Sequence, residues 1–231
     1  MKFNPTAFIG IDNRRYRNWD GYSLAYSYDF IKAIEPFVDL YDINTVFDIG
    51  SRDSCQAMEL SDWFPEANIY LFEPVPSSFE YCVDYTKERS NIHCSDIALS
   101  NYSGETTFYQ VVNGNVGASS LLKINDQFST QMHQSEIKVK VDRADRFMID
   151  NNIESVDLLW VDVQGSEIDC FSGFGDGLSN VKAIHTEVGI NSFYEELLTF
   201  MDNAGFANTK VIQNEVGLEV DVVFVNKKYI K

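Results

Sequence analysis

The sequence predicts an α/β fold with a mostly parallel sheet, and two observations support this. Short β-rich runs alternate with segments of helical periodicity from about residue 27 onward, which is typical of a doubly wound sheet with helices on both faces. The last two β-rich runs flank the turn Glu215–Gly217, so a terminal hairpin should add an antiparallel strand near one edge. The earlier strands and this hairpin together make a seven-stranded sheet.

The predicted strands are short runs rich in apolar, β-branched and aromatic residues. They cover residues 45–50, 69–73, 91–99, 158–163, 181–188, 209–213 and 220–226. Helices are predicted over residues 27–41, from the first glycine turn to Trp63, over 76–89 and over 195–203. Pro36 makes the first helix imperfect, because proline lacks a backbone donor and introduces a kink or a new first turn.

Two segments stand outside this alternation. Residues 1–25 are irregular and aromatic, and we expect an arm or lid in front of a domain that spans 26–231. Residues 101–141 contain short candidate strands at 106–112, 119–124 and 136–141. We interpret them as a small β insertion that helps to build the site for an acceptor substrate, or else as an ordinary surface excursion.

Composition limits the classes of partner. The 231 residues include 35 acidic and 18 basic ones, for a formal net charge of -17. Such a surface repels phosphate backbones and anionic lipid, so we expect no nucleic-acid or membrane partner. The sequence shows neither a signal peptide nor a long apolar span, and its four cysteines lack metal-binding spacing. We therefore expect a cytoplasmic protein with reduced thiols. The oligomeric state stays open.

Acidic residues at predicted strand ends indicate a nucleoside site. Asp48, Gly50 and Ser51 lie at the turn after the first strand, where glycine lets the backbone approach a ligand. Glu73 lies 23 residues beyond Gly50, at the end of the second strand. A carboxylate there suits the two hydroxyls of a ribose, and ligands of parallel sheets bind at the carboxyl ends of strands. Asp96, with Ile97 and Ala98 after it, is placed for an adenine, or Asp96 is a strand-end cap.

Other nucleotide sites fit less well. Arg52 occupies the position of the second glycine in the dinucleotide fingerprint, and a pyrophosphate needs bare backbone there. A phosphate-binding GxxxxGK loop is also missing from the sequence. The turn therefore favours a nucleoside ligand without phosphate groups.

Several phrases, in order, resemble the FkbM family of S-adenosylmethionine (SAM)-dependent O-methyltransferases. These are VFDIGSRDS (46–54), LFEP (71–74), SDIALS (95–100), SSL (119–121) and LLWVDVQGSEIDCFSGF (158–174). The resemblance implies a Rossmann-like class I methyltransferase sheet, SAM as the methyl donor, and hydroxyls of carbohydrates or related metabolites as acceptors. It also implies that Asp48 and Gly50 contact the methionine part of SAM, Glu73 the ribose, and the Asp162 region the reaction centre.

The chain departs from the family pattern at two places. Ser51, Arg52 and Ser54 stand where members commonly have alanine, asparagine and glycine. Ser54 suits a helix cap, whereas Arg52 either narrows the cleft or pairs with an acid. In the DVQG phrase, Gln164 replaces the family's usual glutamate. An essential glutamate at that position would mean that this chain is altered or impaired in activity.

The candidate catalytic residues follow the fourth and fifth strands. Transfer to an alcohol needs a base or a metal near the hydroxyl. Asp162 ends the fourth strand and is the first candidate, with Glu187 and His185 of the fifth strand as further ones. His185 fits a buried core histidine equally, and Glu167 fits a helix N-terminus. If Asp162, Glu167 and Glu187 cluster, they could bind Mg²⁺ or share a proton.

Three other functions compete with O-methyl transfer. One is a non-catalytic SAM- or nucleoside-binding module, which the replacement at Gln164 favours. Another is N- or C-methyl transfer to small molecules, although the sequence lacks the DPPY or NPPY motif of many such enzymes. The third is an NAD-dependent sugar-modifying enzyme. If the chain is an O-methyltransferase, its expected partner is a small-molecule or glycan acceptor. Ser119 and Ser120 either touch a ligand or shape a turn.

Overall fold

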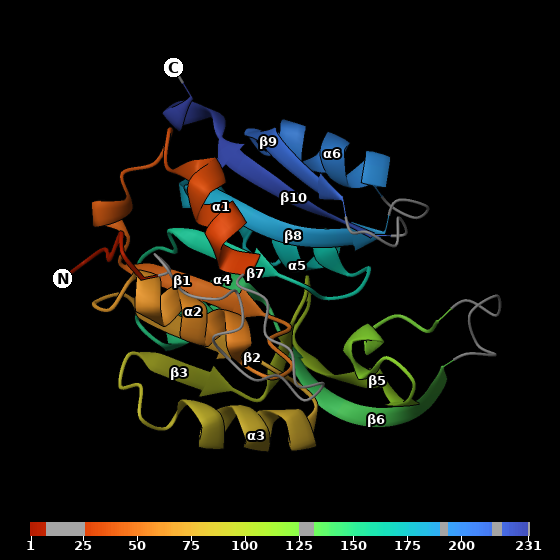
Figure 1. Ribbon diagram of the computed structural model, residues 1–231. Helices are drawn as coiled ribbons and strands as arrows, with labels where there is room; N and C mark the ends of the chain where they lie inside the picture. Colours follow the sequence, from red (N-terminus) through yellow and green to blue (C-terminus); the bar gives the residue numbers. More distant parts are fainter. Residues whose placement is uncertain (8–25, 125–131, 190–193, 214–218, 231) are drawn as a thin grey trace.

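Short, buried, β-rich runs form a seven-stranded sheet at the centre of the molecule (Figure 1). The computed structural model describes residues 1–7, 26–124, 132–189, 194–213 and 219–230. The strand order is β3-β2-β1-β7-β8-β10-β9. The strands are β1 (Thr45–Ile49), β2 (Asn68–Phe72), β3 (Ile92–Ser95), β7 (Leu158–Val161), β8 (Ala183–Gly189), β9 (Phe206–Gln213) and β10 (Glu219–Asn226).

The pairing confirms the predicted topology. β1 pairs in parallel with β2 and β7, and the parallel set extends to β3 on one side and β8 on the other. β10 runs antiparallel to both β8 and β9, so the terminal hairpin supplies the antiparallel element near an edge. β7 is buried along its whole length, as a central strand covered on both faces must be.

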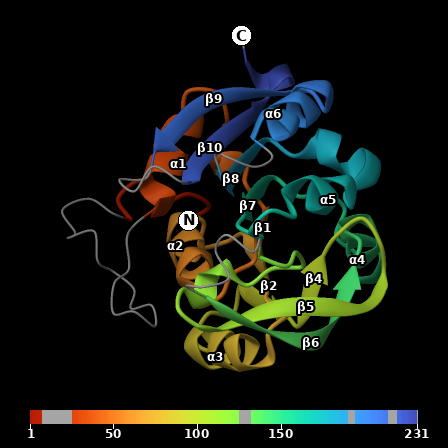
Figure 2. The same cartoon turned by 90° about the vertical axis from the view of Figure 1, so that its right-hand side faces the viewer.

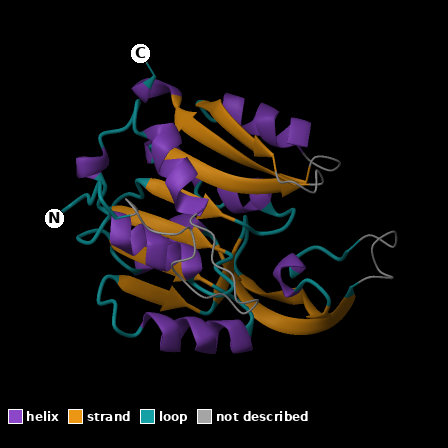
Figure 3. Cartoon of the chain, viewed as in Figure 1, coloured by secondary structure: helices purple, strands orange, loops and turns teal. Residues whose placement is uncertain are grey.

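Helices cover both faces of the sheet (Figure 3). One apolar cluster joins the sheet to α1 (Tyr26–Ile34), α2 (Cys55–Trp63) and α3 (Pro76–Thr86). A second cluster joins the opposite face to α4 (Ala144–Asp150), α5 (Glu167–Ser172) and α6 (Tyr194–Asn203). Short 3-10 turns complete the described chain: η1 (Leu40–Asp42), η2 (Val116–Ala118), η3 (Gly175–Asn180) and η4 (Lys227–Tyr229).

The inserted segment forms a second sheet, of order β4-β6-β5. Its strands are β4 (Ile97–Leu99), β5 (Gly104–Asn113) and β6 (His133–Asp142). β5 and β6 form a long antiparallel pair, which lies beyond the ends of β2 and β3 in Figure 1 and passes close to α3 in Figure 2. The third predicted strand, 91–99, is therefore broken at Asp96: β3 pairs with β2 in the main sheet, whereas β4 pairs with β6 in the inserted one.

Two further predicted elements differ from the structure. The first helix ends at Ile34 rather than at residue 41, because the residue before proline disfavours helical backbone and Pro36 cannot donate. The predicted strand 119–124 is reduced to a single bridge between Tyr109 and Ser120. The hydroxyl of Ser119 donates to the Val116 carbonyl oxygen, and this local bond favours a turn over a strand.

The first seven residues pack against the end of α2. Phe3 is buried and stacks on Trp63, with ring centroids 5.9 Å apart, and the Asn4 amide donates to the Trp63 carbonyl oxygen. The rest of the expected arm, residues 8–25, lies outside the described residues. Among the helices that the structure describes, none has the length and apolar character needed to cross a membrane.

Candidate active site

The site begins at the carboxyl ends of β1, β2 and β7. Ile49 pairs with Phe72 on one side and with Val161 on the other. The next residue on each strand is therefore Gly50 in the middle, Glu73 on one side and Asp162 on the other. The sheet register thus brings the predicted ribose-binding acid and the predicted catalytic acid to the same edge, as parallel α/β sheets do with their ligand sites.

Gly50 allows the turn after β1 to lie close to the backbone of Asp162. Its φ of +84° lies in the left-handed region, and a Cβ built on it would lie 1.9 Å from the Asp162 carbonyl oxygen. Only glycine has both the conformation and the space. The Gly50 and Ser51 amides both donate to the Phe72 carbonyl oxygen, at 3.0 and 3.2 Å, so the turn is fixed against the end of β2.

Glu73 is buried and binds backbone amides with both carboxylate oxygens. Oε2 accepts from the Arg52 amide at 2.9 Å, and Oε1 accepts from the Val75 amide at 2.8 Å. The side chain therefore joins the turn after β1 to the turn after β2. Each carboxylate oxygen has further acceptor capacity, and Glu73 lines a cavity beside these turns. Burial raises the pKa of Glu73 to about 7.

Asp48 lies beneath the Gly50 turn rather than in the cavity wall. It is buried, and its Oδ2 accepts from the Ser51 hydroxyl at 2.5 Å. Burial raises the pKa of Asp48 to about 7, against the opposing effect of the Ser51 hydroxyl. Asp48 and Ser51, both predicted to bind the ligand, thus bind one another. Their hydrogen bond stabilises the turn at Gly50, which lines the cavity.

Arg52 was expected either to narrow the cleft or to pair with an acid, and in the structure it pairs with Asp53. Its guanidinium binds Asp53 Oδ2 through Nη2 at 2.7 Å and through Nε at 3.1 Å. Ser54 is the N-cap residue of α2, but its side chain makes no capping bond. Asp53 Oδ1 accepts from the Cys55 amide at 3.3 Å instead, so the aspartate caps the helix that the serine was expected to cap.

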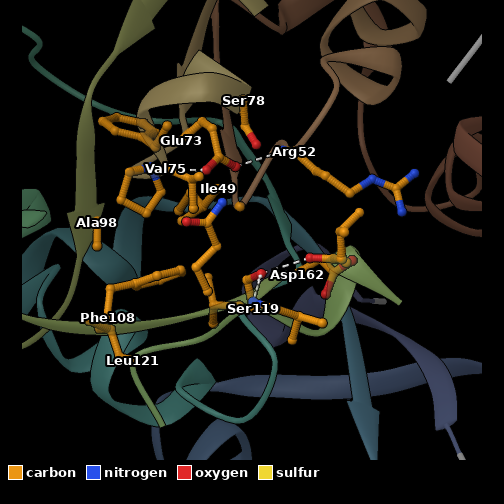
Figure 4. A pocket seen from close by; sticks show the side chains of 18 of the residues that line it. Ile49, Arg52, Glu73, Val75, Ser78, Ala98, Phe108, Ser119, Leu121 and Asp162 are labelled. Carbon is orange, nitrogen blue, oxygen red and sulfur yellow. Dashed lines mark hydrogen bonds between the residues drawn. The ribbon is translucent and has the colours of Figure 1, made fainter. Parts of the chain in front are cut away.

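A cavity of about 320 Å³ connects the Glu73 end of the site to Asp162 (Figure 4). This volume lies in the usual range for small-molecule sites. The wall combines a few polar groups with many apolar side chains. Its members include Ile49, Gly50, Arg52, Phe72, Glu73, Val75, Ile97, Ala98, Phe108, Val111, Gly117, Ser119, Leu121, Asp162 and Val163.

The inserted sheet supplies the apolar side of this cavity. Phe108 of β5 and Leu121 pack with Val75 in one apolar cluster, and all three line the cavity. The sequence prediction did not include these three residues; the one available signal was the apolar Val75, two residues after the strand-end acid Glu73. The insertion therefore lines the same cavity as Glu73.

Of the predicted adenine-side residues, Ile97 and Ala98 line the cavity. The carboxylate of Asp96 is half-exposed and pairs with Lys140 Nζ at 2.7 Å. Asp96 lies between β3 and β4, and Lys140 lies on β6. This position matches the second interpretation of Asp96, a residue that caps the end of a strand. The structure does not bring Asp96 into the cavity wall with its two neighbours.

Gln164 connects the two candidate catalytic carboxylates. Its amide nitrogen Nε2 lies 2.6 Å from Asp162 Oδ1 and 3.2 Å from Glu187 Oε1. Asp162 follows β7 and Glu187 lies in β8, and these strands are parallel neighbours. Asp162 and Glu187 therefore lie close together, with the Gln164 amide donating to both of them.

The remaining candidates point elsewhere. Glu167 is buried and its Oε1 accepts from the Gly165 amide at 2.9 Å at the start of α5, which matches the helix N-terminus alternative. His185 is buried, stacks on Trp160 with centroids 3.6 Å apart, and lies 3.5 Å from Asp221 Oδ1. Burial lowers the pKa of His185 to about 3. Among the described residues, no three His, Cys, Asp or Glu side chains are arranged to hold a metal ion.

Four buried carboxyl groups should make the free energy of unfolding of the SAM-free protein depend on pH. Burial raises the pKa values of Asp48, Glu73, Glu167 and Glu59 to about 7. Their unfolded values lie near 4, so the folded state binds more protons between about pH 4.5 and 7, and stability falls as the pH rises through that window. Urea unfolding should give a larger free energy of unfolding at about pH 5.5 than at about pH 7.5.

The matched control for this prediction is Glu59→Gln, which removes one raised carboxyl from the contact between α1 and α2. Glu59 accepts from both the amide and the hydroxyl of Ser27 and is outside the cavity wall. The pH slope should become shallower in this variant. A free energy of unfolding that stays constant or rises between the two pH values would contradict the assignment of raised pKa values.

Comparisons with known proteins identify the family and the fold of the chain. Residues 41–207 match the model of the methyltransferase FkbM domain. The 2-O-methyltransferase NoeI of Sinorhizobium fredii is 27% identical over 194 residues, which cover 79% of each chain. The precorrin-6y C5,15-methyltransferase of Geobacter metallireducens superimposes with a TM-score of 0.53 at 10% identity, covering 94% of this chain and 93% of that one.

A fibrillarin–Nop5p complex contains a further similar chain, with a TM-score of 0.54 at 16% identity over 93% of this chain and 90% of that one. At such identities the likeness shows the fold alone, which is that of the class I SAM-dependent methyltransferases. The family match covers more than half of the residues and includes the β1 turn, Glu73 and the Asp162–Gln164 segment. The chain belongs to the FkbM methyltransferase family.

Proposed function

We propose that this SAM-dependent methyltransferase transfers the methyl group to a hydroxyl of a sugar, a glycan or a related small metabolite. The observation that carries the proposal is that Glu73 and Asp162 line the same cavity, one toward each end. A nucleoside donor bound by its ribose at Glu73 would extend along the Gly50 turn toward Asp162. The reacting group would then lie beside the Asp162–Gln164–Glu187 cluster.

The cavity residues fit the adenosine part of SAM. Glu73 presents carboxylate oxygens that can accept from ribose hydroxyls in addition to the two backbone amides, and the apolar wall around Val75, Ala98 and Phe108 suits a purine. A buried, mostly apolar wall with few polar groups is typical of small-molecule sites. When bound, SAM supplies an activated methyl group on a sulfonium.

The chain's own residues then have to align the acceptor and remove its proton. Alignment of reacting groups is worth up to about 7–11 kcal/mol in favourable intramolecular models. The Asp162 carboxylate would accept the hydroxyl proton as the acceptor oxygen takes the methyl group that SAM would supply. The buried histidine His185 is unsuited to that proton transfer, because it stacks in the core and its pKa is lowered to about 3.

The choice of a hydroxyl acceptor draws on the related protein named as a 2-O-methyltransferase and on the carboxylate pair, which can accept a hydroxyl proton. The net charge of -17 supports a small-molecule or glycan acceptor over nucleic acid or an anionic membrane surface. The cysteines Cys55, Cys82, Cys94 and Cys170 are free thiols, which supports a cytoplasmic location.

Methyl transfer can be tested directly with SAM carrying a labelled methyl group and a panel of monosaccharides and short oligosaccharides. We expect protein-dependent label in a base-stable ether linkage on at least one sugar. A Glu73→Ala protein at the same concentration is the matched control and should show little transfer. Label on nitrogen or carbon would contradict the proposed hydroxyl acceptor, and SAM binding without transfer would indicate a non-catalytic binding module.

The inserted sheet should contribute to donor affinity. Phe108→Ala removes the largest side chain that β5 contributes to the apolar cluster with Val75. Loss of about 1 kcal/mol of apolar contact corresponds to roughly fivefold weaker binding. Calorimetric titration with SAM should therefore give a dissociation constant about three- to tenfold higher than that of the wild type.

The control for this experiment is Tyr102→Ala, an exposed residue before β5 and outside the cavity wall, which should bind SAM like the wild type. Phe108→Leu should recover part of the affinity. Equal dissociation constants for Phe108→Ala and the wild type would show that the insertion does not contact the donor.

A further inference from the structure

We propose that Gln164 is a positioning residue whose side-chain amide cross-links Asp162 to Glu187 and sets the orientation of the Asp162 carboxylate. The importance of that orientation for methyl transfer rests on the proposed function. The cross-link itself rests on the two contacts of Nε2, at 2.6 Å to Asp162 Oδ1 and 3.2 Å to Glu187 Oε1. One primary amide carries two N–H donors, so it can donate to both carboxylates at once.

The sheet register explains why a bridge is needed. Val161 of β7 pairs with Thr186 of β8, and the next residue on each strand is Asp162 and Glu187. Two carboxylates at adjacent positions on neighbouring strands repel one another. The Gln164 amide lies between them and donates to each, which favours both charges without adding a third.

The backbone conformation of the turn after β7 directs the Gln164 side-chain amide toward the two carboxylates. Gln164 has a φ of +54° and Gly165 a φ of +102°, so the chain reverses sharply after β7. The Ser120 hydroxyl is close to the carbonyl oxygens of both Val163 and Gln164, at 3.2 and 2.9 Å. The Gly165 amide donates to Glu167 Oε1 at 2.9 Å. A non-glycine residue in left-handed backbone persists when its surroundings fix it, and here they fix it from the inserted segment and from α5.

These contacts also connect the bridge to the donor cavity. Ser120 lies between Ser119 and Leu121, which both line the cavity, and its hydroxyl binds the same turn that carries the bridging amide. The insertion and the carboxylate pair are thus held by one turn. In this arrangement Gln164 acts through Asp162, which makes it a positioning residue rather than a catalytic one.

Two substitutions separate the hydrogen bonds from the charge. Gln164→Met keeps the side-chain length and neutrality but removes both donors. Gln164→Glu keeps the shape, removes the donors and places a third carboxylate between Asp162 and Glu187. An effect common to both variants belongs to the lost donors, and the additional effect in Gln164→Glu belongs to the added charge.

The bridge can be observed without any methyl acceptor. In the full-length protein, the side-chain amide signals of Gln164 in a ¹H–¹⁵N NMR spectrum are assigned by their loss in Gln164→Met. We expect them to shift in both Asp162→Asn and Glu187→Gln. Asp169→Asn removes an exposed carboxylate of α5, which binds Asn101, and should leave the signals unchanged. Signals that respond to neither Asp162→Asn nor Glu187→Gln would overturn the bridge.

Kinetics with the sugar that the wild type methylates test the positioning role. Gln164→Met and Gln164→Glu should each lower kcat at least tenfold, while the dissociation constant for SAM stays within about twofold. In an Asp162→Asn background, Gln164→Met should lower kcat further by less than about twofold, because the carboxylate that it orients is already lost. A full independent loss in that background, or an unchanged kcat in the single variants, would overturn the proposal.

The two hypotheses fail differently. A wild-type protein that transfers no methyl group to any acceptor contradicts the proposed function, and the NMR comparison still decides whether Gln164 bridges the two acids. A wild type that is active, combined with Gln164 variants of unchanged kcat, leaves the proposed function in place and rejects Gln164 as a positioning residue.

Discussion

Asp162→Asn is expected to lower kcat by about a hundredfold or more, the usual contribution of a general base, while SAM affinity stays within about twofold. Asn keeps the shape of the side chain and can still accept from the Gln164 amide, which lies 2.6 Å from the Asp162 carboxylate. It removes the charge that would take the acceptor proton. The cavity end at Glu73, where the ribose is proposed to bind, is unchanged.

The measurement is steady-state methyl transfer with the sugar acceptor, together with a calorimetric titration of SAM for each variant. Asp169→Asn is the matched control, since it removes one carboxylate from α5 at an exposed position and should retain wild-type kcat. A fully active Asp162→Asn protein would reject Asp162 as the base and leave Glu187 as the remaining described carboxylate of the cluster.

Glu73→Ala is expected to weaken SAM binding at least tenfold. A hydrogen bond to a charged group contributes about 1.5–3 kcal/mol, and about 1.4 kcal/mol is a factor of ten in affinity. The variant loses the acceptors for the ribose hydroxyls and also the contacts to the Arg52 and Val75 amides. Buried amides left without a partner are costly, so the melting temperature should fall as well.

Glu73→Gln separates these two effects. The amide oxygen can replace one carboxylate oxygen, but its NH₂ group must then face a backbone N–H that needs an acceptor. This variant should bind SAM more weakly than the wild type and more tightly than Glu73→Ala. Calorimetric titrations of all three proteins give the order directly. Unchanged affinity in Glu73→Ala would remove Glu73 from the donor site.

Most of the fold follows from local patterns in the sequence. The buried runs that form β1, β2 and β7 are short and apolar, and each precedes a turn and a helix, so periodicity alone places them. The predicted strand at 91–99 shows what periodicity alone does not reveal. Its residues suit a strand throughout, but tertiary pairing divides them between β2 and β6 at Asp96. Propensity does not indicate which partner strand lies beside each half.

The site was predictable where it depends on strand ends and not where it depends on side-chain contacts. Gly50, Glu73 and Asp162 meet because their strands are parallel neighbours, which the α/β pattern implies. The sequence could not show that Asp96 pairs with Lys140, 44 residues away. Nor could it show that Gln164, noted only as a departure from the family motif, donates to two carboxylates.

The proposed placement of donor and base is tested most directly by a crystal structure of the protein with S-adenosylhomocysteine, the demethylated form of SAM. We expect the ribose hydroxyls within hydrogen-bond distance of Glu73, the adenine against Val75 and Phe108, and the sulfur directed toward the Asp162 end of the cavity. A nucleoside bound with its ribose away from Glu73, or with its sulfur directed away from Asp162, would contradict the proposed arrangement of donor and base.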